Sequence, residues 1–169
     1  MFKTSGGKWI APTPIENSLR ADPRISQALV CGARRKHVVA LIALNRPEVI
    51  AWAQSQGLAT ADWPALVRSP EVQAQVQVAV DSTNAHLASF EAIKRFAILE
   101  ADFTIEGGEL TPSLKVKRKA VQLKHADLID SLYDEVFDDA RAGTERRVGR
   151  LRVGARGPRE LRPAALGRG

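Results

Sequence analysis

The chain contains little cysteine, few aromatic residues and no long apolar run. Its single cysteine, Cys31, has no disulfide partner, and the apolar residues before it favour a buried, inert thiol. Cys31 and the three histidines do not have the spacing of metal ligands. No apolar segment approaches the roughly 20 residues that cross a bilayer, and residues 1–5 lack the pattern of a secretory signal. These absences exclude a disulfide-stabilised secreted scaffold and predict a reducing, cytoplasmic setting.

The excess of positive charge belongs to the C-terminal end of the chain. Residues 141–169 contain nine arginines, two glutamates and six glycines, a net charge of +7, with no aromatic residue. Such a segment cannot bury enough apolar area to offset the entropy lost on ordering, so we expect it to be disordered. Residues 1–140 carry 16 basic and 17 acidic side chains. The 169 residues therefore predict one nearly neutral folded domain over residues 1–140, followed by a basic tail over residues 141–169.

The basic tail has two open interpretations. It is either a solvated segment without a partner, or a weak, nonspecific contact for nucleic acid or for anionic lipid at a membrane surface. The tail has no Phe, Tyr or Trp on which bases could stack, so no specific nucleic acid is predicted as a partner. Deleting residues 141–169 separates binding by the tail from binding by the folded domain.

Apolar runs predict the strands of an α+β fold. Residues 25–32 and 38–44 are β-rich runs on either side of a charged turn, and they predict a hairpin with both strands largely buried. Residues 95–99 predict a third strand, and residues 2–10 predict a small N-terminal hairpin. We therefore expect a small sheet of about three strands plus an N-terminal hairpin, packed with helices.

Helix starts are marked by capping residues followed by proline. Thr13-Pro14-Ile15-Glu16 predicts a helix with Thr13 as N-cap and Glu16 completing a capping box. Asn45-Arg46-Pro47-Glu48 predicts a second helix that ends at Gly57, and Ser69-Pro70-Glu71 predicts a longer third one. Amphipathic helix is also expected over residues 120–123 and 128–137.

Residues 109–118, Glu-Leu-Thr-Pro-Ser-Leu-Lys-Val-Lys-Arg, form the most distinctive segment. Pro112 fixes its own φ and favours an extended conformation at Thr111, so the loop that presents Lys115 is conformationally restricted. A lysine is a compact charge on a long stem, suited to reaching a phosphate or carboxylate on a partner surface. The alternative is a solvated basic face formed by Lys115 and its basic neighbours at positions 117–119.

A second unusual loop lies near the N-terminus, at Ser5, Gly6 and Gly7. Paired glycines allow a close approach of the backbone to a ligand, or a positive φ. An ordinary hairpin turn explains the same residues equally well. Neither loop decides the function alone.

Together, residues 2–17 and residues 110–118 resemble the C-terminal domain of AMP-forming acyl-CoA synthetases, in their long-chain fatty-acid branch. The resemblance covers roughly residues 1–137 and follows the predicted order of elements. Across the wider adenylate-forming superfamily a glycine usually precedes the catalytic lysine. Leu114 stands at that position here, a departure that is itself typical of the long-chain branch.

The resemblance implies a lid domain that serves two half-reactions. Lys115 is implied as the catalytic lysine of acyl-adenylate formation from a fatty acid and ATP. Ser5, Gly6 and Gly7 are implied to line the path of coenzyme A in thioester formation, after the domain has rotated. ATP, coenzyme A and Mg²⁺ are the implied cofactors, held mainly by a large adenylating domain that this chain does not contain. Glu16 is implied to be a helix cap and not a ligand.

Three functions follow as hypotheses. The first is the lid domain of a long-chain fatty-acid–CoA ligase, which needs a large adenylating domain as its partner and is expected to be inactive alone. The second is a basic module that binds nucleic acid or makes a peripheral contact with an anionic membrane. The third is a nonfunctional truncated remnant. Acyl-chain length and oligomeric state cannot be predicted from these residues.

Overall fold

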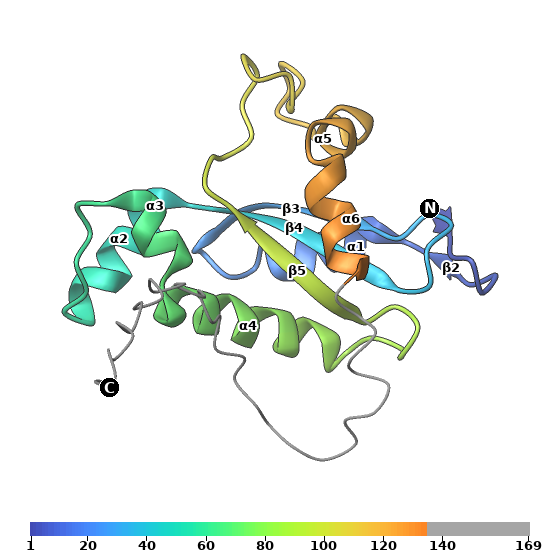
Figure 1. Cartoon of the computed structure of the whole chain (residues 1–169), viewed down its shortest axis with the longest axis horizontal. Coiled ribbons are helices and arrows are strands. Elements are labelled where there is room, and N and C mark those ends of the chain that lie inside the picture. The colour runs from blue at the N-terminus through green and yellow to red at the C-terminus, as the bar shows by residue number, and fades with distance from the viewer. Residues whose placement is uncertain (135–169) are drawn as a thin grey trace, which may run out of the picture. The chain divides into compact units, whose positions relative to one another are not determined.

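The computed structural model describes residues 1–134, and its centre is a three-stranded mixed sheet (Figure 1). Strands β3 (Ile25–Cys31) and β4 (Val38–Leu44) pair antiparallel, as the predicted hairpin requires. Strand β5 (Ile93–Leu99) pairs parallel with β4, which gives the order β3-β4-β5. A parallel partner needs a long crossover, and the helical segment between β4 and β5 provides it.

All seven residues of the central strand β4 are buried, because helices cover both faces of the sheet. Side chains of a strand alternate between the two faces. Val38, Ala40 and Ile42 accordingly belong to one apolar cluster, and Val39 and Leu41 belong to a second. The continuous apolar sequence of β4 reflects burial on both sides.

The first face of the sheet is covered by the helices that precede β5. These are α1 (Pro12–Leu19), α2 (Arg46–Ser55), α3 (Trp63–Arg68) and α4 (Pro70–Asn84). The second face is covered by α5 (Arg118–Lys124) and α6 (Ala126–Asp134), which come after β5. Figure 1 shows α4 along one side of the sheet and α6 on the other. The predicted α+β class, with a small sheet packed between helices, is confirmed.

All three helices predicted from capping residues are present. Two of them, α2 and α4, begin where predicted, whereas α1 begins two residues earlier than predicted. The Ser69 hydroxyl accepts a hydrogen bond from the Val72 N–H at 3.3 Å, so Ser69 caps α4 as expected. Helix α2 begins at Arg46 directly after Asn45, as predicted, although the Asn45 side chain makes no capping hydrogen bond. Gly57 follows the end of α2 at φ +72°, the left-handed conformation that commonly ends helices. Helix α1 instead begins at Pro12 after Ala11 and has no side-chain cap, so Thr13 is not its N-cap and Glu16 is not part of a capping box.

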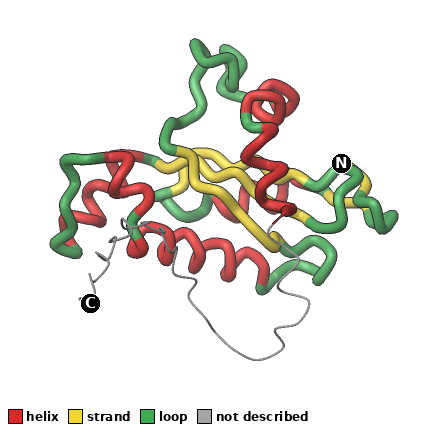
Figure 2. Tube along the Cα trace, viewed as in Figure 1, coloured by secondary structure: helices red, strands yellow, loops and turns green. Residues whose placement is uncertain are grey.

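The predicted N-terminal hairpin is present as β1 (Phe2–Lys3) paired with β2 (Trp9–Ile10). After β5 the chain runs through a long connection that projects from the sheet before α5 begins, drawn as loop in Figure 2. Cys31 is buried, as expected. The predicted basic tail over residues 141–169 and the predicted domain end at residue 140 lie outside the described residues and stay predictions.

Candidate functional site

Lys115 lies in a compact loop that is closed at its base by a bridge between Leu110 and Val116. The Thr111 N–H donates to the Lys115 carbonyl at 2.8 Å, and the Leu114 N–H donates to the Thr111 carbonyl at 2.8 Å. The Thr111 hydroxyl accepts a further hydrogen bond from the Lys115 N–H at 3.0 Å. The backbone of Lys115 is therefore fixed by Thr111 in two places, and this confirms that the loop is conformationally restricted.

Leu114 has a backbone φ of +62°, in the left-handed region. A turn followed by one left-handed residue is the common form of a short hairpin loop, and glycine is the residue best suited to that position. The side chain of Leu114 is 63% exposed, so packing within the domain offsets little of the conformational cost. This backbone geometry gives a physical reason for the glycine that usually precedes the lysine in the wider superfamily.

The loop over residues 110–116, called the lysine loop below, is held from two sides. Its first support is the buried residue Glu109. Its carboxylate pairs with the Lys124 ammonium group and accepts a hydrogen bond from the Thr104 N–H at 3.0 Å. Its carbonyl accepts a hydrogen bond from the Lys117 N–H at 2.7 Å. Burial opposes ionisation, yet the hydrogen bonds from Lys124 and Thr104 and the Lys124 charge outweigh it, and the pKa of Glu109 lies below its ordinary value.

The second support is an ion pair between Glu16 in α1 and Arg118, the first residue of α5. The Arg118 Nη2 atom lies 2.6 Å from each Glu16 carboxylate oxygen. Sequence reasoning missed both supports, because Glu16 and Arg118 are 102 positions apart and a buried acid has no distinctive local pattern. Glu16 is thus an ion-pairing residue of the core and not a helix cap.

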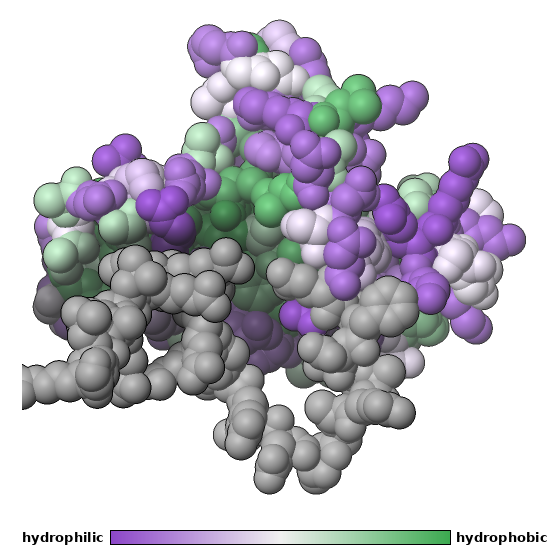
Figure 3. Space-filling view, viewed as in Figure 1, coloured by the Kyte–Doolittle hydropathy of each residue, from purple (hydrophilic) through white to green (hydrophobic). Residues whose placement is uncertain are grey.

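The Lys115 side chain is exposed, and no side chain within residues 1–134 pairs with its ammonium group. The projecting part of the chain that carries it is covered mainly by hydrophilic side chains on the face seen in Figure 3. The loop thus holds the lysine backbone firmly and leaves the charged end of its side chain free to meet an anion outside this domain.

The glycine loop is the tip of the N-terminal hairpin, and Ser5, Gly6 and Gly7 are all exposed. Gly7 has a φ of +81°, which favours glycine whatever surrounds it. Gly6 is different, because a Cβ added there would meet only the Thr4 hydroxyl, at 4.0 Å. No atom among the described residues would obstruct a Cβ at position 6.

Basic side chains gather beside the glycine loop. The Ser5 N–H donates to the Arg35 carbonyl at 2.9 Å, which joins the hairpin to the turn between β3 and β4. In that turn, burial and then the charges of Lys94, Arg95 and Lys36 lower the pKa of His37. Arg35 of the same turn is paired with Asp130 of α6.

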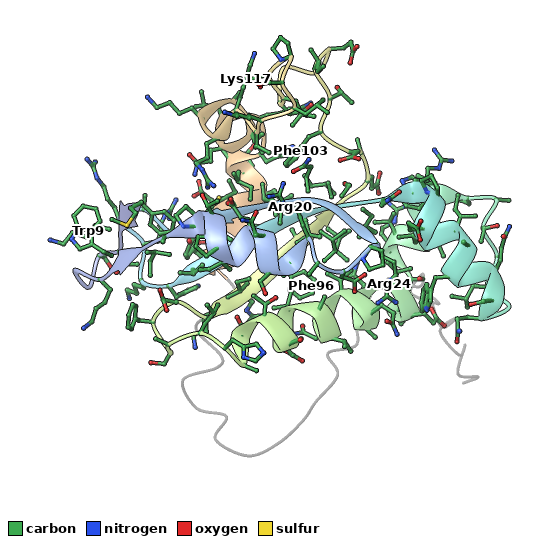
Figure 4. All side chains as sticks on the ribbon, turned by 180° about the vertical axis from the view of Figure 1, so that it is seen from behind. Trp9, Arg20, Arg24, Phe96, Phe103 and Lys117 are labelled. Atoms are coloured by element: carbon green, nitrogen blue, oxygen red, sulfur yellow. The ribbon has the colours of Figure 1, made fainter. Side chains whose placement is uncertain are left out.

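The structure does not bring the two loops together. Figure 1 shows the β1–β2 hairpin at one end of the sheet and the connection between β5 and α5 projecting elsewhere. Figure 4, seen from behind, agrees, because the labelled Trp9 of the hairpin and Lys117 beside the lysine loop lie at different corners. The two loops cannot act on one small ligand at the same time in this conformation.

Two open depressions of the described surface lie outside both loops. An open depression of about 280 Å³ beside Tyr133 and another of about 390 Å³ between α1 and α4 are both lined by other residues. Residues 1–134 also contain no group of three His, Cys, Asp or Glu side chains that could hold a metal ion. No helix in this part of the chain is long and apolar enough to span a bilayer.

Comparison with known proteins identifies the family. Residues 2–137 match the family described as the AMP-binding enzyme C-terminal domain. The chain belongs to this family. Among curated relatives of this AMP-binding C-terminal domain is the long-chain-fatty-acid–CoA ligase FadD15 of Mycobacterium tuberculosis, 40% identical over 133 residues, which cover 78% of this chain. Another is the long-chain-fatty-acid–CoA ligase ACSBG2 of Gallus gallus, 31% identical over 171 residues and 90% of this chain.

Solved structures show the same fold. The adenylation domain of a carboxylate reductase from Mycobacterium chelonae matches 79% of this chain with a TM-score of 0.62 at 21% identity. The A-PCP didomain of a carboxylic acid reductase from Segniliparus rugosus, in complex with AMP, matches the same share with a TM-score of 0.62 at 23% identity. These matches cover 19% and 17% of the two larger chains.

The chain spans only 22% of the length of the two curated relatives. The AMP-binding C-terminal domain is thus a small part of those enzymes. The resemblance noted from residues 2–17 and 110–118 is confirmed at the level of the family.

Proposed function

We propose that this chain is the lid domain of a long-chain fatty-acid–CoA ligase, with Lys115 as its catalytic residue in acyl-adenylate formation. The observation that carries the proposal is an exposed ammonium group on a loop whose backbone is fixed by Thr111 and flanked by the ion pairs of two buried carboxylates, Glu16 and Glu109. Family membership supports the reaction class, because relatives of this domain are named long-chain fatty-acid–CoA ligases.

Adenylation places negative charge where a lysine can stabilise it. The fatty-acid carboxylate attacks the α-phosphorus of ATP, a P–O bond forms, and the bond to pyrophosphate breaks. Negative charge gathers on the oxygens between the two substrates during this step. One preorganised cation there contributes on the order of 3–4 kcal/mol to stabilisation of the transition state, or about 10²–10³ in rate.

The glycine loop is proposed to serve the second half-reaction. The thiolate of coenzyme A attacks the acyl carbon, a thioester forms, and AMP leaves. The exposed backbone of Ser5, Gly6 and Gly7 suits a close approach of the pantetheine chain. Because the two loops lie at separate parts of the domain, the domain has to rotate relative to its partner between the half-reactions.

This domain is proposed to make only a few of the contacts to ATP and coenzyme A, and its partner the rest. Lys115 contributes one cation toward ATP, and the glycine loop contributes backbone surface toward coenzyme A. The described residues offer no ligand set for Mg²⁺, so no step is assigned to that ion here. The large adenylating domain is therefore the partner that would hold the nucleotide and the fatty acid. The predicted cytoplasmic location stays a prediction.

The proposal is tested in a chimera in which this full chain replaces the matching C-terminal part of FadD15. Pyrophosphate release measures adenylation, and acyl-CoA formation from preformed acyl-adenylate measures the second half-reaction. We expect Lys115→Ala to lower the adenylation rate about 10²–10³-fold and to change thioester formation less than about threefold. Lys119→Ala is the matched control, because Lys119 is an exposed lysine four residues further on.

Three outcomes would count against the proposal. They are an unmodified chimera that is inactive in both half-reactions, an equal loss in both half-reactions for Lys115→Ala, and an equal effect of Lys119→Ala on adenylation.

A further inference from the structure

The ion pair of Glu16 and Arg118 spans the edge of the central sheet. Glu16 is 7% exposed and accepts a hydrogen bond from the Val30 N–H at 2.8 Å. The Arg118 Nη1 group donates to the Val30 carbonyl at 3.2 Å, while Nη2 contacts both carboxylate oxygens of Glu16 at 2.6 Å. The two side chains therefore take up both polar backbone groups of one residue and also bind each other.

Val30 lies on β3, which is an outer strand of the sheet. The backbone groups on the open side of such a strand have no strand partner, and buried groups of this kind are costly without hydrogen bonds. Glu16 supplies the acceptor and Arg118 the donor that a neighbouring strand would provide. The position of the Arg118 side chain is thus set by a strand of the core as well as by its charge partner.

The pair also connects the bases of the two functional loops. Glu16 lies in α1, the helix that directly follows the hairpin with the glycine loop. Arg118 begins α5 and is three residues from Lys115. Figure 4 shows α1 below the segment that carries the labelled Lys117. Through this pair the short segment from Lys115 to Arg118 is tied to the rigid sheet and not only to its own turn.

We propose that Arg118 is a positioning residue for Lys115, held in place by Glu16. This inference rests on the proposed role of Lys115 in adenylation. Arg118 donates from two nitrogens of its planar guanidinium, one to the Glu16 carboxylate and one to the Val30 carbonyl, and a lysine ammonium cannot reproduce that fork. A small displacement of a reacting group lowers catalytic rates by up to about 10²-fold.

The test uses Arg118→Lys in the chimera of this chain with FadD15. This variant keeps the positive charge and loses the paired hydrogen bonds. We expect the adenylation kcat to fall about 10–100-fold, with the KM values for ATP and fatty acid changed less than about threefold. Arg24→Lys is the matched control, because Arg24 forms a comparable partly buried pair with Asp22, 2.8 Å away, outside the lysine loop. It should leave adenylation within about twofold at a temperature where both variants are folded.

A double variant separates positioning from general destabilisation. If Arg118 acts through Lys115, Arg118→Lys has no further effect on adenylation once Lys115→Ala is present. An effect of the same size in both backgrounds would overturn the proposal, as would a normal kcat in Arg118→Lys. If Lys115→Ala alone leaves the adenylation rate unchanged, the proposed function itself is refuted.

A second variant covers the case in which Arg118→Lys does not fold. Glu16→Gln keeps the shape of the side chain and an oxygen that can accept from the Val30 N–H. It removes the charge that orients the guanidinium. The same fall in adenylation kcat and the same absence of effect in the Lys115→Ala background are expected, and an effect that persists there would overturn the proposal.

Discussion

Replacing Leu114 by glycine and by alanine tests the geometry of the lysine loop. Both substitutions remove the same exposed side chain, so the difference between them isolates the backbone at φ +62°. Alanine retains the left-handed penalty of about 1–2 kcal/mol, whereas glycine does not. Glycine also gains about 0.4–1 kcal/mol of freedom in the unfolded chain. The Leu114→Gly variant should therefore be more stable than Leu114→Ala by roughly 0.5–1 kcal/mol.

The assay is urea unfolding of the full chain with each substitution, followed by circular dichroism. The midpoint concentration should be higher for Leu114→Gly with an unchanged slope, and the melting temperature should be higher by about 2–5 °C. Ser113 provides the control, because it is the neighbouring turn residue and does not have a positive φ. There alanine should be at least as stable as glycine. Leu114→Ala equal to or more stable than Leu114→Gly would refute the left-handed assignment.

Three further predictions concern the buried carboxylate of Glu109 and the glycines at positions 107 and 6. Because the folded-state pKa of Glu109 is lowered, its ionised form stabilises the native state above about pH 5, and this contribution is lost as the pH falls through the folded-state value. Unfolding free energies measured from pH 7 to pH 3 should therefore show the largest deficit of Glu109→Gln at pH 7; a deficit that grows toward pH 3 would contradict this. Gly107→Ala should destabilise by roughly 1–3 kcal/mol, because its Cβ would collide with the Glu109 carboxylate and lie 2.7 Å from the Thr104 hydroxyl. Gly6→Ala should change stability by less than about 0.5 kcal/mol while slowing thioester formation in the chimera; a normal thioester rate would count against the glycine loop.

The central elements of the fold were predictable because their signals are local. The apolar runs of β3 and β4, the Ser69 cap of α4 and Gly57 after α2 each depend on a few neighbouring residues. Thr13 was wrongly assigned as a cap because Pro12 also suits the first turn of a helix. Helix α3 is absent from the sequence prediction, although a local capping signal for it exists. The Asp62 side chain caps α3 by accepting a hydrogen bond from the Ala65 N–H at 3.0 Å.

The sequence by itself determined the family and the two candidate loops, because both depend on short segments with strong backbone preferences, Pro112 in one and the paired glycines in the other. How those loops are held depends on contacts between residues far apart in the sequence. Glu16 and Arg118 meet across 102 positions, and the partners of a partly buried ion pair are determined by packing and not by their spacing in the sequence. The structure likewise placed Leu114 in the left-handed region, since its backbone conformation follows from the closure of the turn.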